Sequence, residues 1–216
     1  MTKKYRVIRV DGRGFGRSSI PPKGFDWSLE QFSQDSKILI DKLGIDKVHF
    51  VGETIGGSIG MVFAEMFPES CSSLTVCTSP YNFAAVKIYS EYRDLVELEG
   101  VRSWVERTSG NRLPGKSAEH NQWYIDQMAG TAQQVVIETL TYLSTVDLTD
   151  RLKNIECPTL IMVGENSAMN TDGRVGSLAN LIPHAKLVEL PGATGYVQHS
   201  EPEQCAQEWI EFASNL

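Results

Sequence analysis

The segment KVHFVGETIGG, residues 47–57, decides the fold of this chain. Its first five residues, KVHFV, contain two valines and a phenylalanine and read as a strand. A glycine-rich turn follows, and a helical pattern then extends from about Gly56 to the residue before Pro68, where a helix is disfavoured. A strand that passes through a tight turn into a helix is the repeating unit of α/β proteins.

The sequence on either side continues this alternation. A helix is predicted from Ser28 to Leu43, with Ser28 and Gln31 as a capping box and Gly44 as the stop signal. A last helix begins at Pro202. Strand patterns recur at residues 5–10, 73–78, 159–163 and 186–190. The chain is therefore predicted to be an α/β protein with a mostly parallel sheet and helices on both faces.

A block of helical sequence interrupts the alternation between residues 80 and 150. Its predicted helices are residues 84–99, 119–128 and 131–144. Ligands of open α/β sheets bind at the carboxyl ends of the strands, and a helical insertion after the third strand would roof that site. We expect residues 1–80 and 150–216 to form the core, and residues 81–149 to form a helical lid over a pocket.

Charge and composition argue against several kinds of partner. The 216 residues carry 20 basic and 27 acidic side chains, a net charge of −7 that disfavours nucleic acid. No apolar run reaches the roughly 20 residues of a membrane span, so no membrane partner is expected. The four cysteines lack metal-site spacing and suit a reducing, cytoplasmic setting. Arg17 and Ser19 stand where a dinucleotide-binding fingerprint needs glycine, so no cofactor is expected.

Four motifs in a fixed order resemble the α/β-hydrolase fold family. They are DGRGFGRS at residues 11–18, VGETIGG at 51–57, CPTLIMVGE at 157–165, and LPGATGY at 190–196 followed by Pro202 and Glu203. The similarity is greatest to small lidded hydrolases such as the enol-lactone hydrolases. It implies an ancestral activity toward esters or lactones. In that family the first motif follows the fourth strand, so the first strands and an oxyanion loop, roughly 40–60 residues, are expected to be missing here.

The resemblance places the nucleophile at Thr54. The segment GETIG at residues 52–56 matches the nucleophile elbow G-x-S-x-G, with Thr54 at the serine position. The elbow forces a positive φ, which is an outlier for a β-branched residue and costs about 1–3 kcal/mol. The backbone N–H of Ile55 is then the one oxyanion donor that remains in the sequence.

The catalytic base and acid of the family are replaced. The histidine position, after the last strand, is Gly195, and the acid position, two residues beyond Glu165, is Ser167. His199 lies four residues after Gly195 and is the alternative base. Asp172 reads as the N-cap of a helix. The other histidines are expected to be structural or solvated: His49 packed in a strand, His120 on a helix face and His184 on the surface.

Several functions stay open at this point. The first is a degenerate α/β-hydrolase, with hydrolysis weak or lost, that still binds a small apolar or lactone- or ester-like ligand. The second is a working hydrolase that uses Thr54, with His199 or without a base. The third is a non-catalytic ligand sensor that keeps the lidded pocket, and the fourth is a truncated or altered form of a normal hydrolase. Self-association into a homo-oligomer also stays open.

The resemblance raises a question about the sheet. The missing third strand of the family lies between the fourth and fifth, which correspond here to residues 5–10 and 47–51. A gap about two strand spacings wide would leave backbone groups unpaired. One alternative is that another chain supplies the missing strand. Another is that residues 5–10 keep the family's spacing and stay poorly anchored. We predict that residues 5–10 pair directly with residues 47–51, through a right-handed crossover.

Overall fold

The computed structural model describes residues 4–167, 170 and 173–216, and the chain divides into two compact units. The sheet unit comprises Leu29–Asn82 and Asp147–Leu216. The helical unit comprises Met1–Ser28 and Phe83–Val146. The role of the helical unit as a lid stays a prediction.

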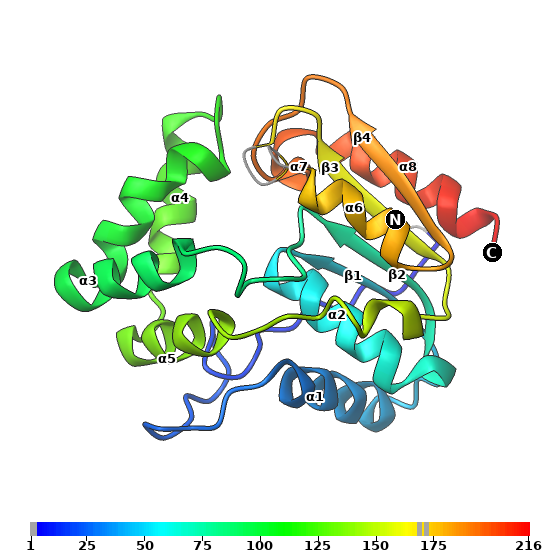
Figure 1. Cartoon of the computed structure of the whole chain (residues 1–216), viewed down its shortest axis with the longest axis horizontal. Helices are drawn as coiled ribbons and strands as arrows, with labels where there is room; N and C mark the ends of the chain where they lie inside the picture. The colour runs from blue at the N-terminus through cyan, green and yellow to red at the C-terminus, as the bar shows by residue number, and fades with distance from the viewer. Residues whose placement is uncertain (1–3, 168–169, 171–172) are drawn as a thin grey trace. The chain divides into compact units, whose positions relative to one another are not determined.

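The sheet unit is built on four parallel strands in the order β1-β2-β3-β4 (Figure 1). All six residues of β3 are buried, as expected for a parallel strand that is covered on both faces. The predicted parallel sheet is confirmed, together with four of the five strand patterns. The strands are β1 (Val48–Glu53), β2 (Cys71–Cys77), β3 (Thr159–Gly164) and β4 (Ala185–Leu190).

Helices cover both faces of this sheet. His49 and Phe50 are neighbours on β1, and successive side chains of a strand point to opposite faces. Phe50 packs against Phe63 of α2 with ring centroids 5.2 Å apart, and His49 packs against Trp209 of α8 at 5.8 Å. α2 and α8 therefore lie on opposite faces. The described helices of the sheet unit are α1 (Leu29–Lys42), α2 (Ile55–Met66), α6 (Arg174–Leu181), α7 (Val197–Ser200) and α8 (Pro202–Ser214), with short 3-10 turns η1 (Pro68–Ser70) and η2 (Leu152–Asn154).

The helix α1 has the ends that the sequence predicts. It begins directly after Ser28 and ends two residues before Gly44, which takes a φ of 67°. The Ile45 N–H then donates to the Ile40 carbonyl at 2.9 Å, so the last turn is closed as in a left-handed glycine cap.

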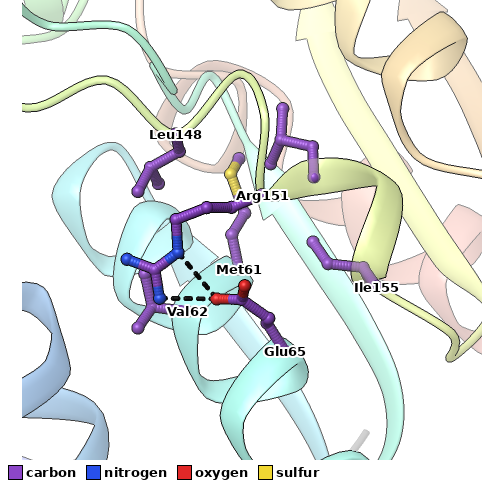
Figure 2. A pocket seen from close by; sticks show the side chains of 7 residues that line it. Met61, Val62, Glu65, Leu148, Arg151 and Ile155 are labelled. Atoms are coloured by element: carbon purple, nitrogen blue, oxygen red, sulfur yellow. Dashed lines mark hydrogen bonds and ion pairs between the residues drawn. The ribbon is translucent and has the colours of Figure 1, made fainter.

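An arginine ties three segments of the sheet unit together. Arg151, just before η2, donates from Nε to Glu65 Oε2 of α2 at 2.7 Å, as Figure 2 shows. It also donates to Glu30 of α1. The hollow beside this cluster leaves no room for a water molecule, so the hollow is not a ligand pocket. The cluster of Arg151 with Glu65 and Glu30 is therefore read as structural. The apolar lining of the hollow consists of Met61, Val62, Leu148, Leu152 and Ile155.

The helical unit contains α3 (Ile88–Arg112), α4 (Ala118–Ala129) and α5 (Gln133–Leu143) among its described residues. Gly100, with φ 86° and ψ 168°, is non-helical, so α3 is two helical segments joined at a kink. The first segment ends where the helix predicted for residues 84–99 ends but begins later, at Ile88, and the second segment was not predicted.

The segment before α1 is held in the helical unit by polar contacts to α5. Glu138 accepts hydrogen bonds from Trp27 Nε1 at 2.8 Å and from the Gly24 N–H at 2.9 Å. The Trp27 bond, followed by the Gly24 bond, lowers the pKa of the Glu138 carboxyl, so this anchor is charged at neutral pH.

Residues 5–10 do not form a strand, and their predicted pairing with residues 47–51 is wrong. Among the described strands β1 has one neighbour, β2. The side chains of Val7 and Val10 are 49% and 60% exposed. A β-branched sequence favours an extended backbone, but a strand exists only where a neighbour exchanges hydrogen bonds with it.

Candidate active site

The turn between β1 and α2 has a strained backbone at Thr54. β1 ends at Glu53, α2 begins at Ile55, and Thr54 between them takes φ 46° and ψ −117°. The Thr54 N–H donates to the Cys77 carbonyl of β2 at 3.1 Å. The Thr54 carbonyl in turn accepts from the Gly57 N–H at 3.1 Å. These bonds hold a conformation that a β-branched residue rarely adopts.

Two glycines permit the close approach of strand and helix at this turn. A methyl group added to Gly52 would lie 2.2 Å from the Gly56 carbonyl oxygen, and one added to Gly57 would lie 1.9 Å from Ser79 Oγ. A methyl group on Gly56 meets open space. Gly52 and Gly57, rather than both glycines of the G-x-S-x-G pattern, are therefore the sterically required pair.

The Thr54 side chain makes no hydrogen bond within the described residues. Every hydrogen bond that Thr54 makes with a described residue involves its backbone. Ile55 is the first residue of α2, so its N–H has no intrahelical acceptor and lies at the positive end of the helix. The turn thus offers a backbone donor for a developing oxyanion, while the Thr54 side chain makes no hydrogen bond with a described residue.

Ser167 and Gly195, which the resemblance predicts at the family's acid and histidine positions, lie against one another. Ser167, after β3, donates from Oγ to the Gly195 carbonyl, after β4, at 3.3 Å, and Ser167 is fully buried. A second hydrogen bond joins the loops that follow β3 and β4: the Asn166 N–H donates to the Ala193 carbonyl at 3.0 Å. A methyl group added to Gly164 would lie 2.5 Å from the same carbonyl oxygen. The structure therefore brings Ser167 and Gly195 together.

The family model for the alpha/beta hydrolase fold matches residues 2–202. The chain belongs to this family. Epoxide hydrolase 1 of Caenorhabditis elegans is 25% identical over 241 residues, which cover 97% of this chain and 58% of that protein. The 3-oxoadipate enol-lactonase 1 of Acinetobacter baylyi is 27% identical over 180 residues, 79% of this chain and 65% of the relative. The chain thus spans less than two thirds of both.

A solved structure shares the fold at lower identity. The enol-lactonase of Burkholderia xenovorans LB400 superposes with a TM-score of 0.82 and 20% identity, over 94% of this chain and 78% of that one. Ser167 and Gly195, which the sequence resemblance predicts at the acid and histidine positions, carry neither a carboxylate nor an imidazole. Gly195 also has a φ of 59°, in the region that favours glycine.

His199, the alternative base, lies near a carboxylate that precedes Thr54. It is on α7, and its Nε2 lies 3.8 Å from Glu53 Oε2, directly before Thr54. Its side chain is 22% exposed. Sequence reasoning missed Glu53. The position of Glu53 directly before Thr54 could have pointed to it. Its partner His199, however, lies near the other end of the chain, so the sequence alone does not show the pair.

The remaining candidate residues have structural surroundings. Glu165 accepts a hydrogen bond from the Gly192 N–H at 2.9 Å, which closes the turn after β4. His49 Nδ1 lies 2.8 Å from Ser73 Oγ, and burial lowers the pKa of His49. His120 on α4 lies beside Trp123, with ring centroids 5.7 Å apart, and His184 is exposed. Asp172 lies outside the described residues.

No metal or membrane element is found in the part of the chain that the structure describes. Within residues 4–167, 170 and 173–216, no three side chains of histidine, cysteine, aspartate or glutamate gather as metal ligands. Over the same residues, no helix combines the length and the apolar character that crossing a bilayer requires.

Proposed function

We propose that this chain is a degenerate α/β-hydrolase, with hydrolysis weak or lost, that retains binding of a small ester- or lactone-like ligand. One observation carries the proposal: the contact of Ser167 with Gly195, at the positions of the family's acid and histidine. Neither residue transfers a proton at neutral pH. The loss of the serine or histidine of a triad lowers kcat by about 10⁶-fold, or about 8 kcal/mol of barrier.

The backbone at Gly195 supports the same proposal. A histidine restored at this position would have to adopt a φ of 59° or move the loop, at a cost of roughly 1–3 kcal/mol. The chain is thus adapted to a glycine there, and its departure from the family is larger than the exchange of one side chain.

The ligand class comes from the relatives, which are named for epoxides and an enol-lactone. Residues 81–149 are proposed as the lid that covers it, since ligands of α/β sheets lie at the carboxyl ends of the strands. A ligand sensor would bind the same ligand class in the same pocket. It would differ from the degenerate hydrolase only in passing the binding event on to a partner. The cytoplasmic location and self-association considered from the sequence stay predictions.

A second candidate function has one observation in its favour. The pair of Glu53 and His199, at 3.8 Å, holds an imidazole next to the turn that carries Thr54. In a working hydrolase this imidazole would take the Thr54 proton. Thr54 lies outside β1, and its side chain makes no hydrogen bond with a described residue, so the degenerate hydrolase stays the first proposal.

Turnover and binding must be measured separately. The protein is assayed against activated esters and enol-lactones beside Thr54→Ala and His199→Ala. We expect no saturable turnover in any of the three. Turnover that both substitutions abolish would establish the second candidate instead. Binding is tested with a lactam that mimics the lactone but resists hydrolysis, and saturable binding without turnover is the expected result.

Restoration of the triad is the complementary experiment. Thr54→Ser alone is expected to give no rate gain, because the new hydroxyl still lacks a base. Combination with Gly195→His and Ser167→Asp should raise the rate, limited by the strained backbone at residue 195. A clear gain from Thr54→Ser alone would reveal a base among the existing side chains, and adding His199→Ala would identify it.

A further inference from the structure

Two cysteines that the proposed function does not use lie in contact in the sheet unit. Cys71 is the first residue of β2, and Cys157 lies two residues before β3. Their sulfur atoms are 3.7 Å apart, although 86 positions separate them in the sequence. Both are free thiols, and 4% and 8% of their surfaces are exposed.

The strand arrangement brings these sulfurs together. β2 and β3 are parallel neighbours (Figure 1), and their ladder pairs Leu74 with Thr159, a few residues beyond each cysteine. Adjacent strands lie about 4.8 Å apart, within the range of about 4.4–6.8 Å between the Cα atoms of disulfide-linked residues.

The β1–β2 ladder is irregular next to Cys71. In the β1–β2 ladder Val48 pairs with Cys71 and His49 pairs with Ser73, so Ser72 is an extra residue in β2. Such a bulge changes the direction of the neighbouring side chains. The sulfur atoms need to approach by less than about 2 Å to reach the bonding distance of about 2.05 Å.

The two thiols differ in acidity as well as in exposure. The contact between the two sulfur atoms lowers the pKa of Cys157, and the same contact, together with burial, raises the pKa of Cys71. Burial raises the pKa of Cys205 to about 11 and that of Cys77 further still. The thiolate is the reactive form of cysteine. Cys157 is also the more exposed of the pair, at 8% against 4% for Cys71, and is the thiol expected to react first.

We infer that Cys71 and Cys157 form a modification site that takes up a reversible intramolecular disulfide, with a small hydroperoxide as the oxidant. The Cys157 thiolate attacks a peroxide oxygen, which breaks the O–O bond and gives a sulfenic acid and, after protonation, water or an alcohol. Cys71 then attacks the sulfenic sulfur, its proton leaves with the expelled hydroxide as water, and the S–S bond forms. Two thiols are oxidised and one peroxide bond is reduced.

The disulfide has a structural consequence. It would close a loop of 86 positions that includes residues 83–146 of the helical unit. Closure of so long a loop restricts the unfolded chain, so the oxidised protein should unfold at a temperature higher by roughly 10 °C.

The test is oxidation of the whole native protein with hydrogen peroxide. Remaining thiols are alkylated in denaturant, and the intact mass and the peptides are then measured. We expect the loss of two hydrogen atoms, a cross-linked peptide pair that contains Cys71 and Cys157, and full reversal by dithiothreitol. Cys205→Ser, the matched control, should cross-link as the natural chain does, whereas Cys71→Ser and Cys157→Ser should not.

Three outcomes would overturn the inference. Four alkylated cysteines after oxidation would mean that the pair is only packed core. A cross-link between Cys77 and Cys205 would place the site elsewhere. Sulfinic acid at Cys157 without a cross-link would show that Cys71 does not resolve the intermediate. Because the peptide map of the natural chain already separates these outcomes, the test holds even if a serine variant fails to fold.

Discussion

Replacement of Thr54 by glycine should stabilise the protein, which is opposite to the usual effect of glycine. Thr54 has a φ of 46°, and a residue held in such a region costs about 1–3 kcal/mol, which glycine does not pay. Against this gain stand roughly 0.5–1 kcal/mol for the greater freedom of glycine in the unfolded chain, and less than about 0.8 kcal/mol for the half-buried methyl group. The expected net change is about 1 kcal/mol in favour of Thr54→Gly.

The comparison of glycine with alanine at this one position isolates the backbone term. Thr54→Ala removes the same hydroxyl and methyl groups but keeps a Cβ atom at positive φ. We therefore expect Thr54→Gly to exceed Thr54→Ala in stability by roughly 1–2 kcal/mol. Gln34, an exposed residue within α1, is the matched control, and there alanine should exceed glycine by about 1 kcal/mol.

The assay is equilibrium unfolding in urea, followed by tryptophan fluorescence and circular dichroism. For a chain of this size a difference of 1 kcal/mol corresponds to about 2–4 °C in Tm, so calorimetry gives a second measurement. A Thr54→Ala variant as stable as Thr54→Gly would refute the argument that the turn stores strain at this residue.

Three further predictions concern the sheet unit. Gly52→Ala should cost about 3 kcal/mol in urea unfolding because its methyl group meets the Gly56 carbonyl, whereas Gly56→Ala, with open space, should be neutral or slightly stabilising; equal effects would contradict the steric argument. Arg151→Ala should cost about 1–3 kcal/mol, and Arg151→Lys should recover only part because lysine cannot bond two carboxylates in the same fork; an unchanged urea midpoint for both would show that the cluster is dispensable. Burial lowers the pKa of His49 below 6.5, so below pH 6.5 the unfolded chain binds more protons than the folded one, and stability should fall with falling pH down to the folded pKa; a pH profile that His49→Gln leaves unchanged would exclude this contribution.

Local sequence signals predicted most elements because their causes are local. The strand at residues 47–51 and the helix that follows it depend on apolar periodicity and on Pro68, all within one segment. The stop at Gly44 depends on the ability of one residue to take a positive φ, and the structure has it there. The end predicted at residue 99 is local in the same way, because Gly100 has a φ of 86° and separates the two helical segments of α3.

The strand predicted for residues 5–10 failed because a strand is a property of two segments. Its Val and Ile side chains do favour an extended backbone, and the segment lies outside the described helices. Pairing depends on which edge of the sheet is available, and that information is spread over the whole chain. The sheet order, with β1 at one end, is therefore known only from the structure.

The sequence by itself determined the motifs and their spacing, and from these it predicted the family's catalytic positions: Thr54 in its glycine-rich turn, Ser167 after one strand and Gly195 after the next. The tertiary structure alone decided what those positions touch. It placed Ser167 against Gly195, His199 beside Glu53, and Cys71 against Cys157. Each of these contacts joins segments that are distant in sequence, and only the packing of parallel strands brings their ends to within a few ångströms.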